Sequence, residues 1–265
     1  RSQTVTGVQT CALPISISGI SAELEATLLG MRARANYSKA MWGKMNPSVN
    51  TGDPLINNSA AVADAQAALA VMAQDYEFEL TFSPSTLQNY VAQQTNQRIE
   101  LVVNPDVYIV ADDDGRRIRN INFPDSTVQI QDPIDNIPDP VLYNTLVEFT
   151  TAIEYAPITV VSAREMRLIL AEAAAAGNGS VDFDTQINAI RTLDGLSDYT
   201  GQITQLEMLQ HTRQVNLFLP DFIHNSYCKG MFRFAFQGAC QTQYLFVIHA
   251  SIQGSVVGHP KVSPG

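Results

Sequence analysis

Two capping boxes constrain the second half of this chain to helices with defined starting points. In Ser162-Ala-Arg-Glu165 the serine hydroxyl can accept from the backbone N–H of Glu165, while the glutamate carboxylate reaches back to the serine. Thr204-Gln-Leu-Glu207 has the same spacing. Apolar residues recur at helical intervals after each box, so both predict amphipathic helices. The apolar residues expected in the core are Met166, Ile169, Leu170 and Ala173 in the first helix and Leu206, Leu209, Val215 and Leu217 in the second.

A further helix is predicted between these two, over Thr185–Leu193. Its apolar side is formed by Phe183, Ile187 and Ile190. Gly177-Asn-Gly179 is expected to end the helix that begins after Ser162, in left-handed geometry. Asp194-Gly195 is expected to turn the chain after the helix over Thr185–Leu193. Helix, short glycine loop and helix is the arrangement of tetratricopeptide-like pairs.

Two more helices are predicted in the first half, over Ala22–Lys44 and Ser59–Gln74, separated by a polar loop that follows Asn46-Pro47. Their apolar stripes are Leu24, Leu28, Met31, Ala35, Trp42 and Met45 in the first and Val62, Ala65, Leu69 and Met72 in the second. Together they predict an αα-hairpin. Trp42 could stack on a sugar ring, but an aromatic residue on such a stripe is expected to lie in the core.

The segment between the helical halves has strand and loop character. Tyr76–Phe82 alternates apolar and polar residues, which predicts a strand, and Arg98–Val103 with Val107–Val110 predicts a hairpin around Asn104-Pro-Asp106. The irregular stretch Pro124–Pro140, rich in Asp and Pro, either carries a binding pocket or is a surface linker. The predicted fold class is therefore mainly α: tetratricopeptide-like helix pairs with a small β-hairpin and irregular loop region.

Asp112-Asp-Asp-Gly115 invites a calcium-loop interpretation, but it lacks the alternating oxygen ligands and the closing Glu of an EF-hand. A tight turn is the expected structure. The net charge of −10 argues against nucleic-acid binding, since the only basic cluster is Arg116, Arg117 and Arg119, expected to be a solvated flank. The sequence contains no apolar run of about 20 residues, so no membrane-spanning helix is predicted.

Cysteine and histidine are absent between Ser16 and Gln210. That stretch is therefore expected to hold no Cys/His zinc site, no cysteine nucleophile and no Ser-His-Asp triad, and the body of the protein to lack an imidazole for chemistry. We expect no catalytic residue, no metal and no cofactor. A glycoside hydrolase, which needs a pair of carboxylates in a cleft, remains an alternative, since acidic residues abound. These include Glu79, Glu100, Glu148, Glu154, Glu165 and Glu172, of which Glu165 is expected to cap its helix and Glu172 to be packed or solvated.

The two ends have a different character from the body. Within residues 1–16, Val5-Thr-Gly-Val-Gln-Thr-Cys-Ala-Leu-Pro-Ile15 resembles the conceptual translation of a sequencing adapter, with a native strand as the alternative. From about Pro220 the composition changes, so 220–265 is interpreted as a separate subdomain or an out-of-frame tail. The fold predictions apply to 17–219.

Several segments of the body, in their order along the chain, resemble the C-terminal half of the SusD/RagB family. They are Tyr76-Glu-Phe78, Arg98-Ile-Glu-Leu101, the helix in Val161–Glu172 with its alanine-glutamate pair, the Ile-Asn-x-x-Arg helix in Asp184–Arg191, the turn Thr192–Leu196, and Leu206–Leu219 with Arg-x-x-Asn-Leu-Phe-Leu. The chain departs from the family at Pro220–His224, where a basic, glycine-containing segment is usual. The family's N-terminal half is not represented.

The resemblance implies a surface-exposed lipoprotein of the bacterial outer membrane that captures an oligosaccharide or peptide and hands it to a SusC-like TonB-dependent transporter, without breaking a bond. The family's signal and lipidated cysteine lie in the half not represented, and no motif identifies ligand-contacting residues. A tetratricopeptide-like scaffold for protein partners is the alternative. If helices that precede this segment are missing, apolar faces near Leu28 and Ala68 are expected to be exposed and the chain poorly soluble alone.

Overall fold

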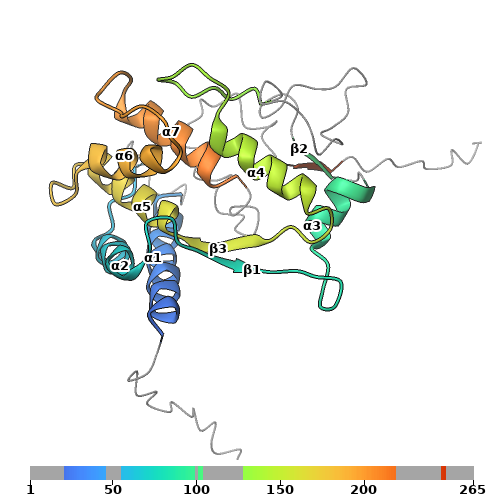
Figure 1. The fold of residues 1–265 in the computed structure, drawn as a ribbon. Coiled ribbons are helices and arrows are strands. Elements are labelled where there is room, and N and C mark those ends of the chain that lie inside the picture. The colour runs from blue at the N-terminus through green and yellow to red at the C-terminus, as the bar shows by residue number, and fades with distance from the viewer. Residues whose placement is uncertain (1–20, 46–54, 99–100, 104–127, 219–245, 249–265) are drawn as a thin grey trace, which may run out of the picture.

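The computed structural model describes residues 21–45, 55–98, 101–103, 128–218 and 246–248. Within them the chain is mainly α-helical, as predicted, with a small antiparallel sheet (Figure 1). The α-helices are α1 (Ala22–Met45), α2 (Ser59–Val71), α3 (Tyr90–Ala92), α4 (Pro140–Thr151), α5 (Ala163–Ala175), α6 (Phe183–Leu193) and α7 (Gln205–Asn216), and α3 continues into a π-helix, η1 (Gln93–Arg98). The strands are β1 (Glu77–Leu80), β2 (Leu101–Val103), β3 (Ile158–Ser162) and β4 (Phe246–Ile248).

Helix α5 lies at the centre of the helical part and is buried on more than one face. The predicted stripe Met166, Ile169, Leu170 and Ala173 packs against α1 and α2, as expected. A second set, Leu168 and Ala171, packs with α6 and α7 around Phe183, Ile187, Ile190, Met208 and Leu209. A helix that is buried nearly all round carries no single amphipathic stripe, which is why periodicity showed only one of these faces.

The predicted pairing of α1 with α2 is confirmed, but the predicted core face of α1 is wrong. Its core residues are Ala26, Ala33, Tyr37 and Met41, whereas Leu24, Leu28, Met31 and Trp42 are exposed. The expected exposure near Leu28 is therefore confirmed, while Ala68 is fully buried beside α5. Around Gly30 the inner face has no room for a side chain, because α1 approaches β3 closely there: a methyl group at Gly30 would collide with Val161 of β3.

A buried polar network crosses this core. The Glu172 carboxylate accepts from the Tyr37 hydroxyl and the Ile56 backbone N–H, both at 2.8 Å, and pairs with Arg213. Arg213 also lies over the Tyr37 ring, 5.1 Å from its centroid. Glu172 is thus a packed residue that ties α5 to α1 and α7.

The two capping boxes differ in outcome. At α7 both reciprocal bonds between Thr204 and Glu207 form, as predicted. At α5 only one of the two bonds forms: the Ser162 hydroxyl accepts from the Glu165 N–H at 3.2 Å. The predicted return bond from the Glu165 carboxylate to Ser162 is wrong. The Glu165 carboxylate instead forms a bidentate pair with Arg34 of α1, because a guanidinium within reach is a better partner than a backbone amide.

The strand over Tyr76–Phe82 forms, shortened to β1, but it does not pair locally. It pairs antiparallel with β3, which periodicity did not predict, with Glu77 opposite Ser162 and Leu80 opposite Ile158. β2 pairs antiparallel with β4. The second strand of the predicted hairpin, Val107–Val110, lies outside the described residues. Asp112–Gly115 and the cluster Arg116, Arg117 and Arg119 also lie outside them.

Helix α4 lies above the β1–β3 ribbon and extends from beside α7 towards α3 (Figure 1). It begins where the predicted loop Pro124–Pro140 ends, with Pro140 in its first turn and Asp139 as N-cap, whose Oδ1 accepts from Val141 and Leu142. Among the described helices, none is long and apolar enough to cross a membrane.

Candidate functional site

An acidic pocket lies where α4 crosses the β1–β3 ribbon. Its polar lining is Glu77 and Glu79 of β1, Thr159 of β3, Thr145 and Glu148 of α4, and Asn216 at the end of α7. Two aromatic residues, Phe149 and Phe218, form its buried apolar part. The pocket is small, about 100 Å³, and open to solvent. Alternation along β1 explains why Glu77 and Glu79 point to the same side.

The carboxylates of this pocket influence one another. Burial of the carboxyl, followed by the like charges of Glu79 and Asp75, raises the pKa of Glu77 to about 7. Burial, reinforced by the charge of Glu148, also raises the pKa of Glu79. None of the described residues lining the pocket is cationic. The pocket is therefore rich in acceptors and, near neutral pH, holds one carboxyl that can also donate.

The amide of Asn216 is held in place from outside the pocket. Its Oδ1 accepts from Arg164 at 2.9 Å, and its Nδ2 donates to the Thr212 carbonyl at 2.9 Å. Arg164 also bonds Asp75 and Asp194, so one guanidinium joins the start of β1, the end of α6 and the end of α7. The pocket wall is therefore braced by three elements.

We predict that Glu77→Gln changes the pH dependence of stability. The pKa of Glu77 is raised in the folded state, so the folded chain binds more protons between about pH 4.5 and 7 and loses stability as pH rises through that window. Because Glu77 is exposed overall, solvent screening reduces the size of this effect. Urea unfolding from pH 4 to 8 should show a flatter profile for the variant. Identical profiles would contradict the raised pKa.

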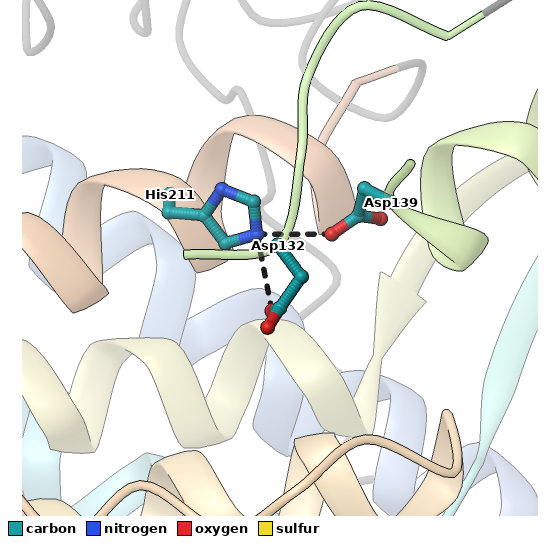
Figure 2. A group of neighbouring side chains, drawn as sticks. All are labelled: Asp132, Asp139 and His211. Carbon is teal, nitrogen blue, oxygen red and sulfur yellow. Dashed lines mark hydrogen bonds and ion pairs between the residues drawn. The ribbon is translucent and has the colours of Figure 1, made fainter. Parts of the chain in front are cut away.

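A second group of polar side chains forms a tight, largely buried cluster of Asp132, Asp139 and His211, drawn in Figure 2. His211 Nε2 lies 2.9 Å from Asp139 Oδ2 and 3.7 Å from Asp132 Oδ2. Arg191 completes the cluster, with its two terminal nitrogens 2.6 and 3.0 Å from the Asp132 carboxylate. The cluster joins the loop before α4 to α6 and α7.

One nitrogen and two carboxylate oxygens at this spacing could be metal ligands, but protein donors already occupy them. Asp132 Oδ1 accepts from the N–H groups of Ile134 and Asp135 in addition to Arg191. Asp139 Oδ1 caps α4, and its Oδ2 faces the imidazole. A cation bound here would have to displace Arg191 from Asp132 and break the contact between His211 and Asp139. We therefore interpret the cluster as a structural network of ion pairs and hydrogen bonds that anchors the loop before α4 to α6 and α7, and we call it the latch.

The sequence pointed to this latch only in part. The loop Pro124–Pro140 is predicted either to carry a pocket or to be a surface linker, and its two buried residues Asp132 and Asp139 belong to the latch and not to the acidic pocket. The expectation that the body lacks an imidazole is wrong, because His211 is the first residue after the histidine-free stretch. Trp42, expected in the core, is 48% exposed and lies in neither group. Glu79 and Glu148 were visible only as scattered acidic residues.

No family model, curated protein or solved structure matched this chain.

Proposed function

We propose that this chain is a binding protein for an oligosaccharide or a similar nutrient, acting at the bacterial outer membrane as a surface-exposed lipoprotein that delivers its ligand to a SusC-like TonB-dependent transporter. The acidic pocket is the observation that carries the binding part of this proposal. The resemblance to SusD/RagB proteins supports the location and the transporter partner. Helix pairs supply a rigid scaffold, and a tetratricopeptide-like scaffold for protein partners is the competing function.

The chemistry of the pocket suits a polyhydroxylated ligand. Carboxylates accept hydrogen bonds from sugar hydroxyls, and the hydroxyls of Thr145 and Thr159 can donate or accept. Apolar side chains below them suit the C–H face of a sugar ring. The small volume fits one end of a chain and leaves the remainder in solvent. Such a site recognises its ligand without a nucleophile, and we propose no bond breakage.

Binding is tested by isothermal titration calorimetry with a panel of neutral and amino-bearing oligosaccharides. Glu79→Gln is expected to weaken the best ligand about tenfold, roughly 1.4 kcal/mol, because a charged acceptor becomes a neutral amide. Glu23→Gln is the matched control, since Glu23 lies on the exposed first turn of α1. If no saccharide binds, or if both variants bind like the wild type, this pocket is not the ligand site.

A glycoside hydrolase would need a pair of carboxylates such as those of the acidic pocket. A separate experiment therefore tests whether the protein cleaves its ligand. Ligands from the panel are incubated with purified protein and examined by chromatography for shorter products. We expect none. Turnover that survives purification and is lost in Glu77→Gln would show an enzyme instead of a binding protein.

A further inference from the structure

The acidic pocket gathers negative charge that no cation in its lining balances. Glu77 and Glu79 lie on β1 and Glu148 lies on α4, and none of the described residues that line the pocket is cationic. Burial, and then the like charges of neighbouring carboxylates, Glu148 among them, raise the pKa of both β1 carboxyls. The charge of Arg164 opposes this at Glu77, but its guanidinium is already bonded to two other carboxylates and an amide. A hollow lined by one sign of charge attracts ions of the other sign.

The cavity offers a ligand more than charge. The Asn216 amide is held in one orientation, because its Oδ1 accepts from Arg164 and its Nδ2 donates to the Thr212 carbonyl. A primary amide nitrogen has two N–H groups, so a second donor of fixed direction remains on this wall of the pocket. Phe149 and Phe218 supply an apolar wall. Acceptors, an oriented donor and aromatic surface together are the composition of a small-molecule site.

The spacing of the three glutamates favours an organic cation over a metal ion. In the described part of the chain, only the latch brings three possible metal ligands within 4.8 Å of one another. The pocket carboxylates are therefore too far apart to surround one metal ion, and Ca²⁺ and Mg²⁺ each need about six or more oxygens at close range. An ammonium group has three donors and needs only one or two carboxylates. Hydroxyls on neighbouring carbons of the same ligand can reach the remaining acceptors.

We propose that the acidic pocket selects an oligosaccharide that carries a protonated primary amine, such as an oligomer of an amino sugar, over a neutral oligosaccharide of the same shape. This selectivity rests on the proposed binding function and adds to it the chemical class of the ligand. The ammonium group lies among the carboxylates of β1 and α4, where its hydrogen bonds are charge-assisted. The C–H face of the sugar ring lies against the aromatic wall.

Isothermal titration calorimetry of the full chain measures this preference with oligomers of glucosamine and of glucose that have the same length and linkage. At about pH 6 the amine carries its proton, so the two ligands differ in ammonium groups that replace hydroxyls. The glucosamine oligomer is expected to bind about tenfold more tightly, because a charge-assisted hydrogen bond is about twice as strong as a neutral one. Its advantage should shrink as salt is added, since salt screens exposed charges.

Two substitutions on α4 locate the preference in the pocket. Glu148→Gln should weaken the glucosamine oligomer more than the glucose oligomer, because it removes a charge and keeps the size of the side chain. Thr145→Val is the matched control, one turn earlier on the same helix, and should weaken both oligomers by the same factor, because the hydroxyl that it removes is neutral. Circular dichroism verifies that each variant is folded.

Proton release tests the contact with Glu77. The pKa of Glu77 is raised to about 7, chiefly by burial, so this carboxyl is largely protonated at about pH 6. A bound ammonium group favours the ionised form, and binding should therefore release a proton, which titrations in two buffers of different ionisation enthalpy detect. Glu77→Gln should abolish this release. Equal release by wild type and variant would place the amine outside the pocket and overturn the inference.

The remaining outcomes separate this selectivity from the binding function itself. If both oligomers bind equally and Glu79→Gln weakens both, the binding function stands and the preference for an amine is overturned. If neither oligomer binds, both fail. A preference that Glu148→Gln leaves unchanged also overturns the inference. Trilysine tests a peptide as the source of the amine: binding tighter than that of the glucosamine oligomer would overturn the assignment to a saccharide.

Discussion

Glu172→Ala is expected to lower the free energy of unfolding by about 3–5 kcal/mol, the largest effect of any single substitution considered for this chain. Glu172 is 1% exposed, and its carboxylate is the acceptor for Tyr37, Ile56 and Arg213. Removing it leaves the Arg213 guanidinium buried without this counter-charge and takes an acceptor from two further donors. Urea unfolding followed by circular dichroism measures the loss. Glu23→Ala, on the exposed first turn of α1, should change stability by less than about 0.5 kcal/mol.

A double variant separates the loss of the ion pair from the loss of packing. Glu172→Leu with Arg213→Met should be less destabilised than the sum of its two single substitutions, because neither buried charge then remains without its partner. Additive losses would show that the two side chains stabilise the core independently, which would contradict the role assigned to the pair.

Arg191→Ala is expected to have the second largest effect, again about 3–5 kcal/mol. Its side chain is 2% exposed, and the Asp132 carboxylate that it holds is fully buried. The Asp132 carboxylate then lacks the guanidinium that pairs with it, so the loop before α4 loses its anchor on α6. The matched control is Arg32→Ala, which breaks the Arg32–Asp64 pair. Breaking that pair should change stability far less than Arg191→Ala does, because the Arg32 side chain is 63% exposed and solvent screens its charge.

The pH dependence of the same variant identifies the cause. Burial alone would raise the pKa of Asp132, but the hydrogen bonds from Arg191 and from the N–H groups of Asp135 and Ile134 hold it below its ordinary value. Asp132 therefore contributes stability above its unfolded pKa of about 3.9, and this contribution is lost as pH falls through the folded value. In Arg191→Ala burial prevails, so the difference in stability between wild type and variant should shrink as pH falls below about 4. A difference independent of pH would contradict this.

Local signals determined much of the helical part. The serine and threonine caps at Ser162 and Thr204 begin α5 and α7, and Gly177 and Gly195 adopt the left-handed conformations that end α5 and α6. These predictions held because a cap or a turn depends on residues within a few positions of each other. Periodicity likewise placed α2 and the inner side of α6 correctly.

The functional groups come from contacts that no local pattern contains. Glu77 and Glu148 lie on different elements, and they share a pocket only because β1 pairs with β3 and α4 crosses that ribbon. His211 meets Asp139 only because α7 packs against the loop before α4. A sequence can show that acidic residues are numerous, but two carboxylates interact only when tertiary packing reduces their separation.

By itself the sequence determined that this is a mainly helical chain, where several of its helices begin and end, and that its central strand region interrupts them. Only the tertiary structure decided which face of α1 became core and that α5 is buried on a second face. Helix α1 carries apolar residues on two sides. Ala26, Ala33, Tyr37 and Met41 form the inner side, where the close approach of β3 to Gly30 leaves no room for a side chain, and Leu28 and Met31 remain on the surface.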